Sequence, residues 1–242
     1  ELKTAKKLKV IGRAGSGLDN IDTAFAQEHG IKVLNAPGTN ANAVAELALA
    51  LLLAAARDLP SAVLAAKAGQ KFSPSGVELQ GKTLGIIGFG HIGRRVAQLA
   101  SAFGMELLIR DPYLEPEELA EFRGFQFLQF DEVLSRSDFI SLHVPLKEDT
   151  FEMINAEAIA KMRAGVYVIN TARAEVVDER AILEGLKSNK IKRYAADFAK
   201  TPELISHERV ILTPHIGAST EEAQKRAGLE IAQKVLDALS KL

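Results

Sequence analysis

Residues 81–97 limit the possible folds of this chain more than any other stretch. They begin with the apolar run 84–87, continue with three glycines in the spacing Gly88-x-Gly90-x-x-Gly93, and end with apolar residues at helical spacing. This order predicts a β-strand, a tight turn and an α-helix, which together form the first half of a parallel βαβ unit.

The glycine turn has the physical properties of a phosphate-binding site. Gly88 permits a backbone conformation that a Cβ atom forbids, Gly90 allows a ligand to approach the backbone, and Gly93 lets the helix pack on the strand. The start of the helix, at His91 and Ile92, presents unpaired N–H groups and the positive end of the helix dipole. An ordinary glycine-rich loop is the alternative interpretation, but the strand before the turn and the helix after it favour dinucleotide binding.

Asp111 strengthens this interpretation. It follows the next apolar run, residues 106–110, where a carboxylate accepts hydrogen bonds from the ribose hydroxyls of an adenosine. A carboxylate in this place also repels the 2′-phosphate of NADP. NAD is therefore the expected cofactor, although the neighbouring Arg110 weakens that preference.

Downstream of residue 83, short apolar runs alternate with helical patterns. The expected strands are residues 83–88, 106–110, 125–129, 139–142, 166–170, 193–196 and 210–212, and the expected helices are residues 91–103, 115–122, 131–135, 156–162 and 179–186. This alternation predicts an α/β fold with a doubly wound parallel sheet of the Rossmann type. The carboxyl ends of its strands meet at one edge, where ligands bind.

The two ends of the chain predict part of a second, smaller unit. Strands are expected at residues 8–11 and 31–34, and helices at residues 22–29, 41–57, 60–68 and, after the helix-start signal Ser219-x-x-Glu222, at residues 220–239. The helix at residues 41–57 is apolar on nearly every face, so we expect it between two domains or at a subunit interface. It therefore also predicts a homodimer.

Composition excludes several classes of protein. The chain has no cysteine, which excludes disulfides, thiolate metal sites and cysteine nucleophiles, and its net charge of −1 gives no reason to expect a nucleic acid or an acidic membrane as partner. The apolar run 47–56 has about half the length that a bilayer requires. We expect a cytoplasmic protein without a metal, and an N-terminally truncated one because the first residue is Glu1 rather than Met.

Two side chains with suitable chemistry follow later strands of the predicted sheet. Arg173 comes directly after the run 166–170, where its guanidinium can bind a carboxylate through two parallel hydrogen bonds. A surface ion pair with Glu175 or Asp178 is the alternative. His215 follows the last strand and can exchange a proton near neutral pH, although a packing or capping histidine is the simpler interpretation of its position.

Seven motifs, taken together, resemble the D-isomer-specific 2-hydroxyacid dehydrogenase family. They are Arg13-Ala14-Gly15-x-Gly17-Leu18-Asp19-Asn20-Ile21-Asp22, Asn35-Ala36-Pro37-Gly38, Ala45-Glu46-Leu47, Gly88-x-Gly90-His91-Ile92-Gly93, Leu142-His143-Val144-Pro145-Leu146, Asn170-Thr171-Ala172-Arg173 and Pro214-His215-Ile216-Gly217-Ala218-Ser219-Thr220. The resemblance covers nearly the whole chain. The first and last motifs are most similar to D-3-phosphoglycerate dehydrogenases, which makes 3-phosphoglycerate and 3-phosphohydroxypyruvate the leading substrate pair.

The resemblance implies a role for each matching position. Arg173 would bind the carboxylate of a 2-oxo acid and His215 would be the acid and base, while Ser16, Gly17 and Asn40 would lie at the substrate. Contacts with NAD would come from Gly88, Gly90, His91, Ile92, Gly93, Asp111, His143, Val144, Pro145, Thr171, Ala172, Asp197 and Gly217. The implied domains are a partial, flavodoxin-like substrate or lid domain with the interdomain helix at residues 1–59, an NAD domain at residues 60–218, and a helix returning to the substrate domain at residues 219–242.

One segment departs from the family pattern. The family has Asp-Val-Phe-x-x-Glu-Pro, whose glutamate pairs with the catalytic histidine, whereas this chain has Asp197-Phe198-Ala199-Lys200-Thr201-Pro202-Glu203. Thr201 stands before the proline, and Glu203 is a possible substitute for the glutamate. A histidine without a carboxylate partner is less basic and less well oriented.

The sequence thus leads to two hypotheses. The first is an NAD-dependent oxidoreductase that interconverts a small D-2-hydroxy acid and its 2-oxo acid. The second is a catalytically impaired dimer of the same fold that binds or senses NAD, which the altered segment after Asp197 favours.

Overall fold

The computed structural model describes residues 2–73, 76–114, 122 and 124–241. The chain divides into two compact units, one of Glu1–Val44 with Gly217–Leu242 and the other of Ala45–Ile216. The first division falls between residues 44 and 45 rather than 59 and 60, because most of helix α2 (Ala41–Arg57) packs into the larger unit. The interpretation of the two units as a lid domain and an NAD domain stays a prediction.

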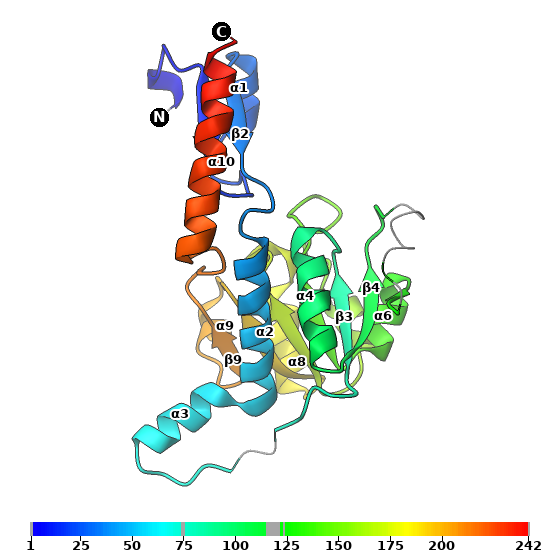
Figure 1. Cartoon of the computed structure of the whole chain (residues 1–242). Helices are drawn as coiled ribbons and strands as arrows, with labels where there is room; N and C mark the ends of the chain where they lie inside the picture. The colour runs from blue at the N-terminus through cyan, green and yellow to red at the C-terminus, as the bar shows by residue number, and fades with distance from the viewer. Residues whose placement is uncertain (1, 74–75, 115–121, 123, 242) are drawn as a thin grey trace. The chain divides into compact units, whose positions relative to one another are not determined.

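The larger unit is built around a seven-stranded sheet in which every neighbouring pair of strands is parallel. The strands are, in spatial order, β5 (Gln126–Phe127), β4 (Glu106–Arg110), β3 (Thr83–Ile87), β6 (Phe139–Leu142), β7 (Val166–Asn170), β8 (Ile191–Ala196) and β9 (Val210–Leu212). The predicted α/β fold with a doubly wound parallel sheet is confirmed (Figure 1).

The direction of winding reverses at β3. From β3 the chain proceeds outward to β4 and β5, and then returns to β6 on the other side of β3 and continues to β9. Both neighbours are in register with β3, because Leu84 pairs with Leu107 of β4 and with Phe139 of β6. Ligands of open α/β sheets bind at such a reversal, beyond the carboxyl ends of the strands.

Alternate residues of β3 pack on opposite faces of this sheet. Leu84 and Ile86 belong to a buried cluster with α2 and α4 (His91–Ala102), whereas Ile87 belongs to a second cluster on the other face. The helices of that second cluster are α6 (Phe130–Arg136), α7 (Ala156–Lys161), α8 (Glu179–Lys187) and α9 (Pro202–Ile205). Each fully buried aliphatic side chain contributes about 1.5–3 kcal/mol, so the two clusters fix the strands that carry the site.

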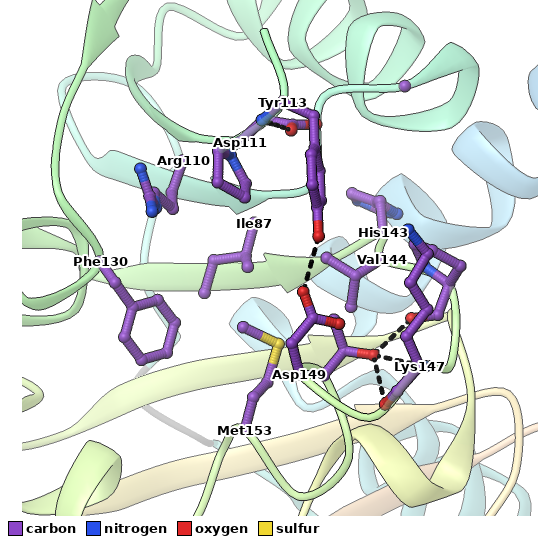
Figure 2. A pocket seen from close by; sticks show the side chains of 15 residues that line it. Ile87, Arg110, Asp111, Tyr113, Phe130, His143, Val144, Lys147, Asp149 and Met153 are labelled. Atoms are coloured by element: carbon purple, nitrogen blue, oxygen red, sulfur yellow. Dashed lines mark hydrogen bonds between the residues drawn. The ribbon is translucent and has the colours of Figure 1, made fainter.

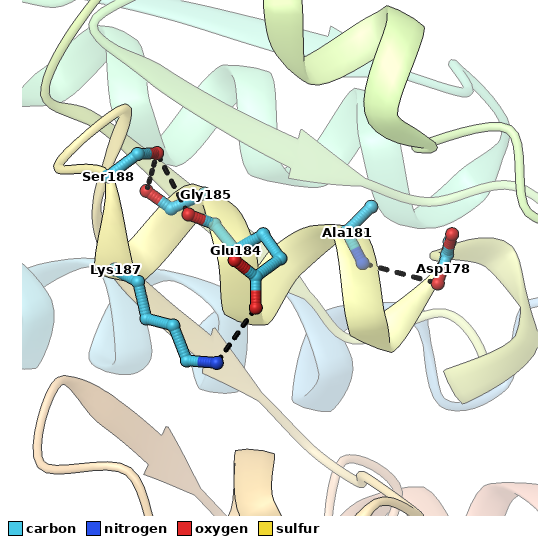
Figure 3. A network of polar contacts seen from close by, with 6 residues as sticks. All are labelled: Asp178, Ala181, Glu184, Gly185, Lys187 and Ser188. Carbon is cyan, nitrogen blue, oxygen red and sulfur yellow. Dashed lines mark hydrogen bonds and ion pairs between the residues drawn. The ribbon is translucent and has the colours of Figure 1, made fainter.

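Helix α8 is anchored at both ends (Figure 3). At its start the Asp178 carboxylate accepts a hydrogen bond from the backbone N–H of Arg180 (2.9 Å). It also accepts one from the N–H of Ala181 (3.2 Å), which Figure 3 shows. At its end the Ser188 hydroxyl donates to the Glu184 carbonyl (2.8 Å). An N-cap of this kind typically contributes about 1 kcal/mol. The cap also fixes the chain just after the short 3₁₀ helix η2 (Ala174–Val176) that follows Arg173.

The smaller unit contains two parallel strands, β1 (Val10–Arg13) and β2 (Lys32–Asn35), joined through α1 (Thr23–Glu28). Its remaining helices are η1 (Leu2–Thr4) and the long α10 (Glu221–Leu239). Helix α10 lies against β1, where a Cβ atom on Gly12 would be 2.6 Å from Val235 Cγ2. The Asp22 carboxylate caps α1 by accepting from the Phe25 N–H, as expected from the sequence.

Several predicted bounds shift in the structure. The first strand begins at Val10 rather than residue 8, the strand expected at 125–129 has only two residues, and β8 begins at Ile191 rather than residue 193. The short helices η1, η2 and α9 were not predicted, because each spans no more than four residues and lacks a readable periodicity. The helix expected at 115–122 lies mostly outside the described residues.

No single helix in the described part of the chain has the length and hydropathy needed to cross a membrane. Helix α2 and the following α3 (Leu59–Lys67) meet that requirement only when taken together, and they are bent by 65°.

Candidate active site

The carboxyl ends of six adjacent strands carry most of the residues that the sequence singles out. Asp111 follows β4, the glycine turn follows β3, His143 follows β6, Arg173 follows β7, Asp197 follows β8 and His215 follows β9. Neighbouring strands are about 4.8 Å apart, so β4 and β7 are separated by roughly 14 Å. The polar groups therefore form a row along one edge of one sheet.

Packing explains two of the three glycines in the turn after β3. Gly88 has a φ of +93°, and a Cβ atom there would be 2.6 Å from the His143 carbonyl oxygen. A Cβ atom on Gly93 would be 2.0 Å from the Gly88 carbonyl oxygen. A Cβ atom on Gly90, in contrast, would meet nothing within 4 Å. Gly90 is the N-cap of α4, so open space lies beside the start of this helix, where a phosphate would bind.

The Asp111 carboxylate is held by the backbone on both sides. Its Oδ2 accepts from the Phe89 N–H at 2.8 Å, and its Oδ1 accepts from the Tyr113 N–H at 3.0 Å. These bonds tie the end of β4 to the glycine turn. A carboxylate has about four acceptor positions, so both oxygens can still accept from ribose hydroxyls.

A cavity of about 530 Å³ lies at the reversal point between the ends of β4 and β6 (Figure 2). Its volume is within the range typical of small-molecule sites. The lining residues are Ile87, Gly88, Gly90, Arg110, Asp111, Pro112, Tyr113, Phe130, His143, Val144, Pro145, Lys147, Asp149, Thr150 and Met153. The structure thus brings together, in one cavity, the predicted cofactor contacts of the glycine turn, Asp111 and residues 143–145.

His143 is a neutral residue in the wall of this cavity. Its Nε2 lies 2.8 Å from the Ser141 hydroxyl, and its Nδ1 is buried without a hydrogen-bond partner in the described structure. Burial lowers the pKa of His143 to about 3. The ring is therefore uncharged near neutral pH and suits packing against a cofactor better than proton transfer.

The loop that carries Arg173 is braced by the side chain of Asn170. The Asn170 amide donates to the Arg173 carbonyl (2.8 Å) and to the Tyr194 hydroxyl (3.2 Å), and its oxygen accepts from the Ala172 N–H (3.0 Å). The Thr171 hydroxyl oxygen is buried and has no hydrogen-bond partner in the described structure. Buried polar groups are nearly always paired, so this atom suits a ligand contact.

The two carboxylates closest to Arg173 in the sequence each have another contact. The Glu175 carboxylate lies 2.5 Å from the Lys200 ammonium, and Asp178 caps α8. The hydrogen bond from Lys200 holds the pKa of Glu175 below its usual value, and the charge of Arg173 adds to this effect. The role of Arg173 at a ligand stays a prediction.

Asp197 holds the backbone around His215. Its carboxylate accepts from the Thr213 hydroxyl (2.5 Å) and the Ile216 N–H (2.8 Å), and its carbonyl accepts from the His215 N–H (2.8 Å). His215 has a φ of +56°, a left-handed conformation that costs about 1–3 kcal/mol in a non-glycine residue. Such strain is typical of functional sites, because the surroundings must maintain it.

The His215 ring is exposed and packs edge to face on Phe198, with 5.0 Å between ring centroids. Among the described residues, no carboxylate is hydrogen bonded to this ring. The segment that departs from the family pattern is held elsewhere, because the Glu179 carboxylate accepts from the N–H groups of Lys200 (2.8 Å) and Thr201 (2.6 Å). Glu203 lies exposed in the first turn of α9.

The predicted substrate residues belong to the smaller unit. The Ser16 hydroxyl donates to the Asn40 side-chain oxygen at 3.0 Å, and the Asn35 amide donates to the Ser16 carbonyl at 2.7 Å. The structure therefore brings Ser16, Gly17 and Asn40 together, and their role at a substrate stays a prediction. Gly217 is also in this unit, at the start of its second segment.

The comparison with known families decides the identity of the fold. Residues 49–217 match the model described as "D-isomer specific 2-hydroxyacid dehydrogenase, NAD binding domain". The chain belongs to the D-isomer specific 2-hydroxyacid dehydrogenase family. NAD is the cofactor of this family, and its members are NAD-dependent oxidoreductases.

Curated relatives in the family carry different names. A hydroxypyruvate reductase of Thermotoga maritima is 47% identical and is matched over 98% of this chain and 80% of its own length. A D-3-phosphoglycerate dehydrogenase of Methanocaldococcus jannaschii is also 47% identical, over 97% of this chain but only 46% of its own length. The chain thus spans about half the length of the latter relative.

Solved structures of the family have the same fold. A glyoxylate reductase from Paecilomyes thermophila superposes with a TM-score of 0.89 at 36% identity, covering 98% of this chain and 74% of that protein. A D-lactate dehydrogenase from Aquifex aeolicus, complexed with NAD and lactic acid, gives a TM-score of 0.88 at 34% identity and covers 99% of this chain and 78% of that protein.

Sequence reasoning missed three residues that line the cavity or brace the site. Tyr113 comes two residues after Asp111, so its closeness to the ribose-binding position could be predicted from the sequence. Asp149 lies 36 residues further on, and only the fold brings it to Tyr113. Asn170 was seen as part of a motif, but its bracing hydrogen bonds could not be read from the sequence. Among the described residues no cluster of three histidine or acidic side chains is arranged to hold a metal ion.

Proposed function

We propose that this chain interconverts a small D-2-hydroxy acid and its 2-oxo acid with NAD as the hydride carrier. The observation that carries the proposal is the order of groups along one sheet edge. Asp111 and the cavity lie toward one end of the row, the glycine turn lies next, and Arg173 and His215 lie toward the other end. An extended dinucleotide placed along this row has its adenosine at Asp111 and its nicotinamide toward Arg173 and His215.

Each of the two catalytic candidates has a chemical task in this reaction. Arg173 binds the carboxylate of the 2-oxo acid with its planar guanidinium and so fixes the direction of the carbonyl. His215 donates a proton to the carbonyl oxygen during reduction and removes it from the hydroxyl during oxidation. NAD, when bound, accepts or supplies the hydride at the substrate carbon.

We propose 3-phosphohydroxypyruvate as the leading substrate. Relatives named D-3-phosphoglycerate dehydrogenase, at 43–47% identity, support it, while the hydroxypyruvate reductase at 47% identity supports the unphosphorylated acid. The test compares kcat/KM for the two acids with NADH. A higher value for the phosphorylated acid is expected, and a higher value for hydroxypyruvate would reassign the substrate.

A non-catalytic NAD-binding protein is the second candidate. The observation that favours it is the exposed His215 ring, to which no carboxylate among the described residues is hydrogen bonded. Titration with NADH, followed by turnover assays with 2-oxo acids, separates the two. Tight NADH binding without turnover of any 2-oxo acid would decide for the second candidate.

We also propose a homodimer. Helix α2 gives little support for a subunit interface, because its residues Ala48–Ala56 are mostly buried within the larger unit. Helix α3 gives better support, since its apolar side chains Leu59, Val63 and Leu64 are 46%, 50% and 69% exposed and a partner subunit would cover them. Leu64→Glu should lower the sedimentation coefficient from the value of a dimer to that of a monomer. A parent chain that sediments as a monomer would refute this part of the proposal.

A further inference from the structure

Tyr113 is an exposed aromatic residue in the wall of the cavity beside Asp111. It follows β4 by three residues, and 64% of it is exposed. Figure 2 shows its phenol pointing to the Asp149 carboxylate, which belongs to the loop after β6. The side chain thus connects the loops on the two sides of the reversal point.

Three contacts fix the position of this ring. The Tyr113 N–H donates to the Asp111 carboxylate at 3.0 Å, and the Tyr113 hydroxyl donates to the Asp149 carboxylate at 2.7 Å. The Lys147 ammonium lies over the ring, 4.8 Å from its centroid, as in a cation–π contact. An exposed aromatic side chain held at its backbone, its hydroxyl and its face has little rotational freedom left to lose when a ligand binds.

The charges around the ring keep its hydroxyl protonated. The hydrogen bond to Asp149 and the charge of that carboxylate raise the pKa of Tyr113, and the charge of Asp111 adds to the effect. The hydroxyl therefore remains a donor throughout the neutral range, and the bridge to Asp149 persists there.

The other walls of the cavity suit a flat, largely apolar ring. Ile87, Val144, Pro145 and Met153 supply aliphatic surface, and the ribose-binding carboxylate of Asp111 lies next to Tyr113. A base attached to a ribose at Asp111 would therefore lie within reach of the phenol ring. Stacking on an aromatic side chain is a favourable contact for any nucleobase.

We propose that Tyr113 is the adenine-stacking residue of the cofactor site, and that Asp149 and Lys147 are positioning residues that hold its ring across the cavity. This inference rests on the assignment of the cavity to the adenosine half of NAD. Asp111 is expected to contact the ribose, and the inference adds a specific contact between Tyr113 and the adenine base.

The test is calorimetric titration of the parent chain and its variants with NADH, AMP and reduced nicotinamide mononucleotide. Tyr113→Ala should raise the Kd for NADH and for AMP about tenfold, which is the typical effect of removing a stacking partner, and leave the mononucleotide unaffected. Tyr113→Phe keeps the ring and loses only the bridge, so its Kd for NADH should rise about two- to threefold. Phe151→Ala removes a ring that is 54% exposed and lies outside this cavity, and it should change none of the three.

A double-mutant cycle tests the positioning role of Asp149. If Asp149 acts through the Tyr113 hydroxyl, Asp149→Ala should weaken AMP binding about as much as Tyr113→Phe, and the double variant should be no weaker than either. Additive losses would refute this role.

Two results would overturn the main proposal. One is a Tyr113→Ala chain that binds NADH and AMP within twofold of the parent. The other is an equal loss for AMP and for the nicotinamide mononucleotide, which would indicate a general disturbance of the fold. A parent chain that binds neither NADH nor AMP would instead refute the cofactor assignment itself, so the two failures are distinguishable.

Discussion

The two ends of the sheet edge are built differently. At the proposed adenosine end, both oxygens of Asp111 are held by backbone N–H groups, and the Tyr113 ring is fixed by Asp149 and Lys147. At the proposed catalytic end the backbone is held just as firmly, by Asn170 and Asp197, but the His215 ring is exposed and packs edge to face on Phe198. Cofactor binding should therefore tolerate change better than turnover does.

The largest expected effect is on turnover alone. His215→Ala should lower kcat by about 10²–10⁴-fold, since that is the usual contribution of a positioned acid or base, and Arg173→Ala should cause a loss of most of the rate. The NADH Kd should stay near that of the parent in both variants. Stopped-flow or steady-state assays with a 2-oxo acid measure the rate, and NADH fluorescence measures binding.

Two surface variants serve as controls for these losses. Arg163→Ala removes an exposed guanidinium that pairs with Asp138 at 2.8 Å, and His29→Ala removes an exposed imidazole in the smaller unit. Both should retain parental rates. Unchanged turnover in Arg173→Ala or His215→Ala would remove that residue from the mechanism.

The second effect concerns the glycine turn, where NADH binding rather than turnover alone should be weakened. Gly90→Ala should fold normally, because its Cβ atom meets nothing within 4 Å, yet the methyl group would occupy space needed by the pyrophosphate. An inserted methyl group of this kind typically costs about 1–3 kcal/mol, so the NADH Kd should rise about 5- to 150-fold.

Two controls accompany this experiment. Thermal unfolding shows whether each variant folds, and Gly228→Ala is a matched glycine substitution far from the turn in sequence. Gly228 is in the interior of α10 and its Cβ atom also meets nothing within 4 Å, so this variant should match the parent in Kd and melt at a slightly higher temperature, because alanine stabilises a helix interior relative to glycine. Gly93→Ala, in contrast, should lower the melting temperature, because its Cβ atom would be 2.0 Å from the Gly88 carbonyl oxygen. A Gly90→Ala chain with parental NADH affinity would place the phosphates elsewhere.

A smaller effect should come from Asp111. Asp111→Asn keeps an acceptor for the backbone but removes the charge, so NADH binding should weaken about tenfold and the preference for NADH over NADPH should shrink. Dissociation constants for both cofactors check this. Equal NADH and NADPH affinities in the parent chain would show that Asp111 does not select between them.

A separate effect is on stability and involves His143. Because burial lowers its pKa to about 3, the His143 ring of the folded chain stays unprotonated between this value and about pH 6.5, whereas the same ring in the unfolded chain takes up a proton there. Stability is thus lost as the pH falls through that window, by on the order of 1 kcal/mol per pH unit from this group. His143→Gln should flatten the pH dependence of urea unfolding there. An unchanged slope would contradict the burial of the ring.

The sequence predicts the fold and the row of strand ends well, because both depend on local patterns. The alternation of apolar runs places β3, β4, β6 and β7 nearly to the residue, and parallel strands necessarily bring Asp111 and Arg173 to the same edge. The two-residue β5 is the weakest of these predictions, since so short a strand depends on its neighbour β4 for pairing.

Contacts between distant loops could not be predicted in the same way. Nothing in the local sequence joins Tyr113 to Asp149, or Glu179 to the N–H groups of Lys200 and Thr201, because each contact joins segments that only the fold brings together. The left-handed conformation of His215 could not be predicted either, since the hydrogen bond from its N–H to the Asp197 carbonyl joins the loops after two different strands.

The most direct test of the account is a crystal structure of the chain with NADH and oxalate, a mimic of the 2-oxo acid. We expect the adenosine ribose on Asp111, the pyrophosphate over residues 88–93, and oxalate on Arg173 with the nicotinamide C4 atom about 3–3.5 Å away and His215 on the same side. A nicotinamide that points away from Arg173 and His215, or a dinucleotide bound outside this edge, would contradict it.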